Sequence, residues 1–319
     1  MILFVLPPLT QLNTPYPSIT HLTGYLRSRG IEAEQMDLGI ELINRLFTRV
    51  ELGRVFDVVE SKVESRELKL NKTMRIIVSN RHFYERNVEA VMKFLSGRDL
   101  QLANRFSDLR FWEDMHRLPN EEELEWAFGT SGKVDRAKYL CSLFLKNVVD
   151  VVQLLDEHFQ LIRYAERLCT YLTTFEPLEM ELEKMSLTEN ISLTESTETT
   201  EKASLRLALG NGNMIEELML ELLEKMLQEV KPDWVGLSIP FPGNLLAGLK
   251  CAKYIKAKYE GVKIVMGGGY VNTELRQMRD TGIFKYVDYI TFDDGELPIR
   301  RLIECGELLR TAYLKTTRL

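Results

Sequence analysis

Short apolar runs alternate with amphipathic segments at the start of this 319-residue chain. Residues 2–6 form a β-rich apolar run that Pro7 and Pro8 stop, residues 18–30 carry apolar side chains at helical spacing, and residues 31–38 alternate like a second strand. This order predicts a βαβ unit, in which the two strands are parallel and the crossover is right-handed.

The same alternation resumes in the last part of the chain. Buried strands are expected at residues 233–239, 262–266 and 286–292. Helices are expected at residues 214–230, 245–259, 273–283 and 297–309. Residues 1–40 and 213–309 therefore predict an α/β fold with a doubly wound, five-stranded parallel sheet of the flavodoxin-like or Rossmann-like kind.

The middle of the chain has a different pattern. Residues 41–185 show helical periodicity almost throughout, which predicts a large all-helical insertion in the second crossover. Residues 186–212 include a Ser, Thr and Glu tract that is too polar to build a core, so this segment is predicted to be a polar linker.

Composition and charge exclude several classes of function. The net charge is −6 and the basic residues are dispersed, so we expect no nucleic-acid partner. No apolar stretch approaches the roughly 20 residues that span a bilayer, and the N-terminus lacks a signal-peptide pattern, so we expect a cytoplasmic protein without a membrane partner. The four cysteines are widely separated and predict reduced thiols rather than an iron–sulfur or zinc site.

The expected strand ends carry small, polar or turn-forming residues. In a doubly wound sheet these ends lie at one edge, beside the ligand site. The clusters are residues 7–10, 37–39, 238–240, 267–269 and 293–296. No Gly-x-Gly-x-x-Gly fingerprint, phosphate-binding loop or Gly-x-Ser-x-Gly elbow is present, so NAD and FAD are disfavoured and no self-contained catalytic site is predicted.

Each cluster also permits a purely structural interpretation. The glycine triplet at residues 267–269 suits either a tight turn or flat contact with a bulky ligand. Ser238 suits either a ligand contact or a turn, and Asp37 either a ligand hydroxyl or the cap of the next helix. Glu296 lies where the last helix begins and would interact favourably with the helix dipole.

Four segments together carry a resemblance to a known family. They are PPLTQLNTPYPSITHLTGYLRSRGIEAEQMDL, KPDWVGLSIPF, VKIVMGGGY and YVDYITFDDGELPIRRLI. The chain resembles the N-terminal cobalamin-binding domain of cobalamin-dependent radical S-adenosylmethionine (radical SAM) enzymes. The resemblance covers residues 1–40 and 214–309, and the insertion lies outside it.

The resemblance implies a corrinoid held over the carboxyl edge of the sheet. Ser238 and residues 267–269 would line a slot for the nucleotide tail of cobalamin, and other strand-end residues would border the ring. The full set implied for cofactor binding is Pro8, Leu9, Asp37, Gly39, Ser238, Pro240, Gly267, Gly268, Gly269, Gly295 and Glu296.

Two departures from the family define the functional hypothesis. Where better-known cobalamin modules have Asp-x-His-x-x-Gly, residues 37–41 contain no histidine, so cobalt would take no imidazole from this loop or cobalamin would not bind. The family's CxxxCxxC motif is also missing, which assigns the iron–sulfur cluster and S-adenosylmethionine to a separate downstream domain, with residues 310–319 leading toward it. The predicted function is a cobalamin-binding module for a radical SAM catalytic domain acting in cis or in trans.

Two alternatives come from other classes of function. One is a doubly wound scaffold without a cofactor, which acts as a protein-interaction module through an exposed apolar face of its helical insertion. The other is a small-molecule enzyme of unrelated chemistry on the same fold, since a fold does not fix a function.

Overall fold

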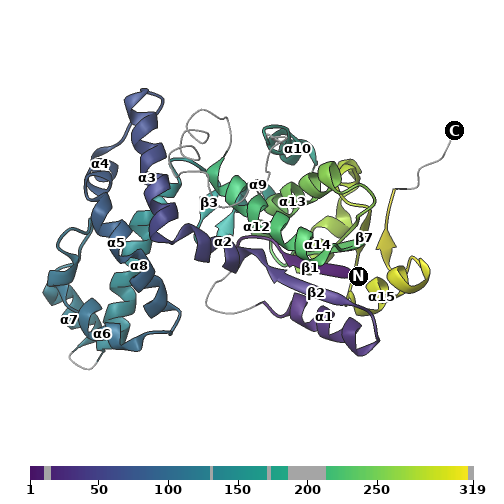
Figure 1. Ribbon diagram of the computed structural model, residues 1–319, viewed down its shortest axis with the longest axis horizontal. Helices are drawn as coiled ribbons and strands as arrows, with labels where there is room; N and C mark the ends of the chain where they lie inside the picture. Colours follow the sequence, from purple (N-terminus) through teal and green to yellow (C-terminus); the bar gives the residue numbers. More distant parts are fainter. Residues whose placement is uncertain (11–15, 130–131, 171–173, 186–212, 315–319) are drawn as a thin grey trace. The chain divides into compact units, whose positions relative to one another are not determined.

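A computed structural model of the chain describes residues 1–10, 16–129, 132–170, 174–185 and 213–314 (Figure 1). Contacts divide the chain into two units. Of the described residues, the sheet unit contains 1–10, 16–42, 162–170, 174–185 and 216–314, and the helical unit contains 43–129, 132–161 and 213–215. The predicted linker at residues 186–212 lies outside the described residues.

A six-stranded sheet forms the centre of the sheet unit. In spatial order its strands are β2 (Ala33–Asp37), β1 (Ile2–Leu6), β5 (Trp234–Ser238), β6 (Lys263–Gly267), β7 (Tyr289–Thr291) and β8 (Thr311–Ala312). The predicted α/β class with a mostly parallel sheet is confirmed. The prediction of five strands was incomplete, because β8 adds an antiparallel edge strand within residues 310–319 and is too short to show periodicity.

The strand order reverses between β1 and β5. From β1 the chain first adds β2 on one side, and only after the helical unit does it return to add β5 on the other side. At such a reversal, the connections that leave the two carboxyl ends run in opposite directions, and a crevice forms between them. Phe4 of β1 lies opposite Gly236 of β5, which in turn lies opposite Val265 of β6.

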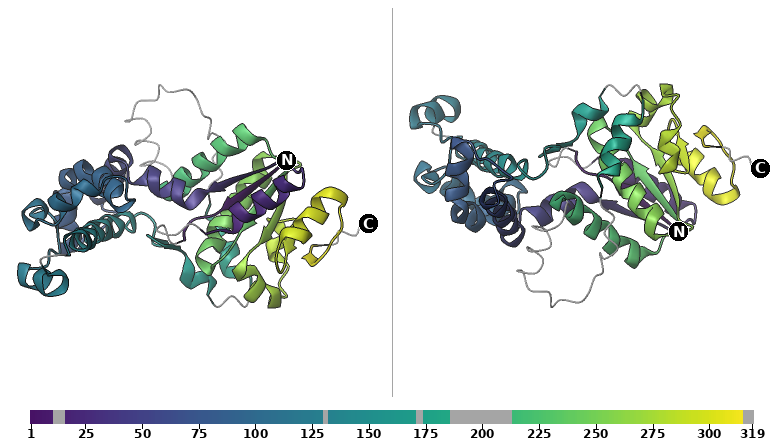
Figure 2. Two further views of the ribbon diagram at one scale, coloured as in Figure 1. Left: turned by 90° about the horizontal axis from the view of Figure 1, so that it is seen from below. Right: turned by 90° about the horizontal axis from the view of Figure 1, so that it is seen from above.

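Helices cover both faces of the sheet. In Figure 1, α1 (Ser18–Ser28) and α15 (Glu296–Cys305) lie below the strands, and α12 (Met214–Val230) and α13 (Leu245–Lys258) lie above them. The views from below and from above in Figure 2 show the same two layers. Apolar side chains of β1, β2 and β6 pack against α1 and α15 in one core cluster.

Buried polar contacts connect α12, α13 and the segment from residue 162 onward. Lys250 forms an ion pair of 2.5 Å with Glu216, and its ammonium also donates to the Tyr164 hydroxyl at 3.1 Å. Glu224 accepts hydrogen bonds from the hydroxyls of Tyr254 and Tyr259 at 2.8 and 2.9 Å. Removing one charge of the Lys250–Glu216 pair would leave the other buried and unpaired, so this pair favours the observed packing of α12 against α13.

Residues 162–185 group with the sheet rather than with the predicted insertion. This segment contains β4 (Arg163–Tyr164), α9 (Glu166–Cys169) and α10 (Glu176–Glu183), and β3 (Phe159–Gln160) precedes it. The Lys253 ammonium donates to the Leu182 carbonyl at 2.5 Å, which holds α10 against α13. Periodicity could not reveal this division, since it reports a helix and not the surface that the helix contacts.

The predicted helix at residues 273–283 was wrong. The chain instead forms α14 (Gly269–Thr273) and the 3-10 turns η4 (Leu275–Gln277) and η5 (Gly282–Lys285). The Asp280 carboxylate accepts hydrogen bonds from the backbone N–H groups of Phe175 and Gly282, at 2.8 and 2.9 Å. Side-chain bonds of this kind give the backbone an alternative to the helix.

The helical unit packs around an aromatic core. Its helices are α3 (Arg49–Glu64), α4 (Lys72–Ser79), α5 (Arg81–Leu95), α6 (Ala103–Phe106), α7 (Glu121–Phe128) and α8 (Lys133–Val152). The unit also contains the 3-10 turns η1 (Leu100–Leu102) and η2 (Leu109–Trp112). The helix α2 (Leu38–Leu46) is divided between the two units, and its residues from 43 onward belong to the helical unit. Phe83 contacts Tyr84, Trp112 and Phe144 with ring centroids 5.4–6.2 Å apart. Among the described residues from 43 to 152 there is no strand. The strands β3 and β4 fall within the segment predicted to be all-helical, so that prediction was wrong there.

Candidate functional site

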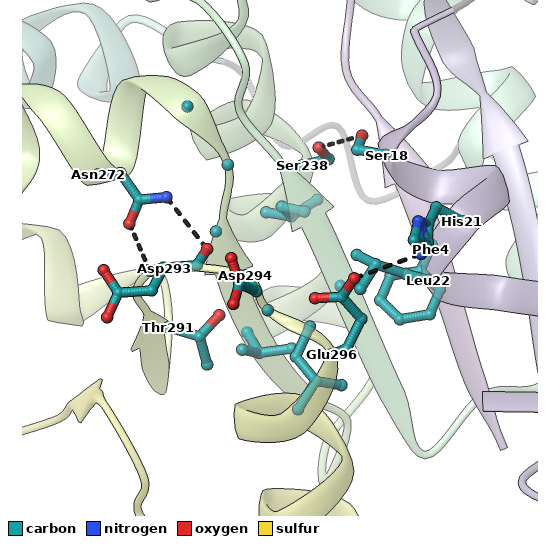
Figure 3. A pocket seen from close by; sticks show the side chains of 18 of the residues that line it. Phe4, Ser18, His21, Leu22, Ser238, Asn272, Thr291, Asp293, Asp294 and Glu296 are labelled. Atoms are coloured by element: carbon teal, nitrogen blue, oxygen red, sulfur yellow. Dashed lines mark hydrogen bonds and ion pairs between the residues drawn. The ribbon is translucent and has the colours of Figure 1, made fainter. Parts of the chain in front are cut away.

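A cavity of about 360 Å3 opens at the carboxyl ends of β5, β6 and β7, between α1 and α15 (Figure 3). The lining residues are Phe4, Tyr16, Pro17, Ser18, His21, Leu22, Gly236, Leu237, Ser238, Val265, Gly267, Gly268, Gly269, Asn272, Thr291, Asp293, Asp294, Gly295, Glu296 and Ile299. The cavity therefore lies at the edge that the strand-end clusters predicted, and it belongs wholly to the sheet unit.

Two positions of the cavity floor are glycines, Gly236 and Gly267. Ser238 pairs in register with Gly267, and Gly236 pairs with Val265, so all four positions face the α1 and α15 layer. A Cβ atom at Gly236 would lie 2.5 Å from Cδ1 of Phe4, whose ring occupies that volume. The cavity floor is thus backbone and apolar side chains.

Sequence analysis missed Gly236 as a site residue. A signal was available, because a glycine within the strand pattern DWVGLSI marks a position where something approaches the backbone closely. The pattern could not say that the approaching group is the ring of Phe4.

Two glycines of the triplet, Gly268 and Gly269, are required by close approach of the backbone. Gly268 has φ of +119°, and a Cβ atom there would lie 2.6 Å from the Ile239 carbonyl oxygen. A Cβ atom at Gly269 would lie 3.0 Å from the carbonyl oxygen of Pro240. The tight-turn interpretation therefore accounts for these two glycines without a ligand, although both line the cavity.

A pair of hydroxyls crosses the cavity from α1 to β5. The side-chain oxygens of Ser18 and Ser238 lie 2.7 Å apart and share a hydrogen bond. Ser238 is buried, and its hydroxyl forms this hydrogen bond with α1, which is far from it in the sequence. It therefore neither caps a helix nor closes a turn. Either hydroxyl can instead meet a polar atom of a ligand if the pair opens.

Acidic groups form the rim. The Glu296 carboxylate lies 3.3 Å from Nε2 of His21, so the first turns of α15 and α1 approach each other there. Asp294 is exposed, and its backbone carbonyl accepts a hydrogen bond from the Glu296 N–H at 2.6 Å. In Figure 3 the carboxylates of Asp294 and Glu296 lie on one side of the opening, with His21 and Leu22 of α1 opposite.

Asp293 has a structural role in the turn after β7. Its backbone N–H donates to Oδ1 of Asn272 at 2.7 Å, and its carbonyl accepts from Nδ2 of the same residue at 3.2 Å. Its carboxylate contacts Arg276 and lies 3.6 Å from Nε of Arg310. These contacts hold a non-glycine residue at φ of +62°.

Five residues implied by the resemblance do not line the cavity. They are Pro8, Leu9, Asp37, Gly39 and Pro240. Asp37 caps α2, because its carboxylate accepts the Ile40 N–H at 3.0 Å, and burial raises its pKa against the opposing effect of that bond. Leu9 is buried, and Gly39 lies against Pro8.

The chemistry of the cavity is that of a binding site. A volume of about 360 Å3 lies at the small end of the range of about 300–1,000 Å3 for small-molecule pockets. The cavity offers apolar walls, hydroxyls and carboxylates, and no cysteine lines it. Burial raises the pKa of the Cys169 and Cys251 thiols to about 12, so these are not activated nucleophiles.

The described residues contain neither a membrane-spanning helix nor a metal-binding cluster. None of their helices is both long enough and apolar enough to cross a bilayer. Among the same residues, no three side chains of His, Cys, Asp or Glu are grouped closely enough to hold a metal ion.

Fold and cavity together define an α/β protein with a mostly parallel sheet and a ligand-sized pocket at its carboxyl edge. Comparison with protein-family models, with curated proteins and with solved structures finds no match to the chain.

Proposed function

We propose that this chain binds cobalamin and serves a radical SAM catalytic domain in cis or in trans. The observation that carries the proposal is the cavity between α1 and α15, whose floor is formed by the Phe4 ring over Gly236 and by the backbone of Gly267. Its place beside the reversal between β1 and β5 supports the proposal, as does the order of the five parallel strands, which is that of flavodoxin-like sheets.

The lining residues suit the nucleotide tail of cobalamin, which joins a flat aromatic base to a ribose and a phosphate. Phe4, Leu22 and Ile299 offer apolar walls for the base. Ser18 and Ser238 offer hydroxyls for its polar atoms. The corrin ring is larger than the cavity and would rest outside it, near Glu296.

Four of the residues that the resemblance implies for cofactor binding do not line the cavity. Pro8, Leu9 and Gly39 pack against other parts of the sheet unit, and Asp37 caps α2, so the proposal assigns none of them to the corrin ring. When bound, the corrinoid would supply cobalt that carries a methyl group or assists a radical step. Residues 37–41 contain no histidine, so this loop would supply no imidazole ligand to cobalt.

Leu22 provides a test that leaves the backbone of the site intact. It is a partly buried residue of α1 that lines the cavity, so Leu22→Trp would fill the space that the tail requires. Tyr25, one turn later on α1, packs in the adjacent core without lining the cavity, so Tyr25→Trp introduces the same side chain as a matched control.

Titration with hydroxocobalamin, followed by the corrinoid absorption spectrum, should give a saturable shift with the unmodified chain and with Tyr25→Trp. Leu22→Trp should weaken binding at least tenfold while its circular dichroism stays unchanged. The absence of a saturable shift in the unmodified chain would exclude the proposal. Equal binding by both variants would exclude this cavity as the site.

The alternative function is that of an interaction module without a cofactor. The observation that favours it is the set of exposed large apolar residues on the helical unit, among them Val50, Leu100 and Trp126. It predicts that partner binding survives Leu22→Trp and fails after substitutions on the helical unit, which separates it from the cobalamin proposal.

A further inference from the structure

An open pocket of about 660 Å3 lies between α7 and α8 of the helical unit. Its lining residues are Pro119, Asn120, Glu122, Glu123, Leu124, Trp126, Ala127, Phe128 and Tyr139. Every one of these belongs to the helical unit, so whatever binds here does not depend on the cavity in the sheet.

Capping contacts hold α7 in a defined position. The Asn120 side chain accepts the Glu123 N–H at 2.8 Å, and the Glu123 carboxylate accepts the Asn120 N–H at 3.2 Å, which completes a capping box. Arg136 of α8 forms two hydrogen bonds of 2.6 and 2.7 Å with the Glu121 carboxylate. The residues that α7 presents to the pocket are therefore fixed by the fold.

Aromatic side chains of this pocket are unusually exposed. Trp126 is 90% exposed and Tyr139 is 42% exposed. The ring of Phe128 lies 5.5 Å from that of Tyr139, measured between centroids. A tryptophan that is 90% exposed buries little apolar area and so contributes little to the stability of the fold, whereas tryptophan is enriched among residues that dominate binding energies.

The charge of the pocket is negative. Glu122 and Glu123 line it, and no described Lys, Arg or His does. Glu122 precedes Trp126 by four residues, so the two side chains are neighbours on the same side of α7. Glu122 forms no ion pair among the described residues, so its carboxylate is available to a cation. A carboxylate beside an open aromatic face is a site for an organic cation.

We propose that this pocket binds an arginine side chain presented by a partner protein. The guanidinium group is planar, so it can stack on the Trp126 ring while it donates hydrogen bonds to the Glu122 carboxylate. A free small cation is a poorer occupant, because an exposed cation–π contact strengthens binding by only about two- to fivefold. In a pocket this open, most of the contact area must come from the chain that carries the cation.

The test uses the full chain labelled with 15N at tryptophan and a short peptide with one arginine in a Gly/Ser sequence. The Trp126 indole resonance is assigned by its disappearance in Trp126→Phe. Titration should shift this resonance saturably, with a dissociation constant on the order of millimolar for so short a probe. The same peptide with citrulline, which is neutral and nearly isosteric, should shift it at least fivefold less at equal concentration.

Two variants separate the pocket from general surface charge. Glu122→Gln should weaken arginine-peptide binding about three- to tenfold, because a charge-assisted hydrogen bond is lost. Glu157→Gln, which removes an exposed carboxylate from a position outside the pocket, should leave it unchanged.

Three results would overturn the proposal. One is an equal response to the citrulline peptide, and another is no saturable shift of Trp126. The third is tighter binding of tetramethylammonium than of the arginine peptide, which would assign the pocket to a free quaternary ammonium. None of these results bears on hydroxocobalamin binding, which is measured at the other unit.

Discussion

Gly268→Ala should strongly destabilise the sheet unit, whether or not a ligand binds. The backbone at Gly268 has φ of +119° and ψ of 179°, a region open almost only to glycine, and holding alanine there costs about 1–3 kcal/mol. The new Cβ would also lie 2.6–2.8 Å from backbone atoms of Ile239, and such overpacking costs about another 1–3 kcal/mol. The expected loss is therefore about 2–6 kcal/mol, a large share of the typical stability of about 5–15 kcal/mol.

Hydrogen-exchange mass spectrometry measures this loss locally, since peptides from β5 and β6 report on the sheet unit separately from the helical unit. Gly24→Ala is the matched control, because Gly24 is exposed within α1 and its Cβ would meet nothing within 4 Å. Alanine there should stabilise the chain by about 0.5–1 kcal/mol.

A loss below about 1 kcal/mol for Gly268→Ala would refute the reasoning from close backbone approach. The reason for a glycine would then have to be sought in a ligand. If the loss is as large as expected, any effect of a bulky residue at Gly268 on ligand binding reflects unfolding. Substitution of Leu22 is therefore the informative test of the cavity.

Other predictions concern buried groups of the sheet unit. Lys250→Met should lower the free energy of unfolding by about 3–5 kcal/mol, because Glu216 stays buried without its cation; a urea midpoint within error of the unmodified chain would contradict this. Burial, together with neighbouring glutamates, raises the pKa of Glu217 to about 7, so its favourable contribution is present below pH 4.5 and is lost as pH rises through 7. Glu217→Gln should accordingly raise the urea midpoint at pH 8 and leave it nearly unchanged at pH 4.5, and equal effects at both pH values would count against the raised pKa. Gly236→Ala should cost about 1–3 kcal/mol, and Phe4→Leu in that background should recover part of the loss, whereas additive losses would show that the two residues do not compete for space.

Much of the sheet could be predicted because buried parallel strands are apolar runs. Residues 2–6 form β1 with the predicted bounds, and residues 262–266 and 286–292 contain most of β6 and all of β7. The helix predicted at residues 273–283 failed because the Asp280 carboxylate accepts hydrogen bonds from the backbone of Gly282 and of the distant Phe175, which periodicity does not register. The short β8 strand depends on pairing with β7 rather than on its own pattern.

The site could be predicted only in part. Ser238 and Glu296 face the cavity as strand-end residues, since parallel strands bring their carboxyl ends to one edge. Asp37 also ends a strand, yet its carboxylate turns to the N–H of Ile40 and caps α2. Adjacency to a strand end places a residue at the edge but does not fix the direction of its side chain.

By itself, the sequence determined that this chain builds an α/β sheet with glycine-rich and polar turns at one edge, because local apolar periodicity and backbone freedom are properties of short segments. Only the tertiary structure decided that Phe4 fills the space above Gly236, that Gly268 lies against Ile239, and that Trp126 is left 90% exposed. Those facts depend on which distant segments contact each other. The local pattern of one segment does not specify the distant segment that packs against it.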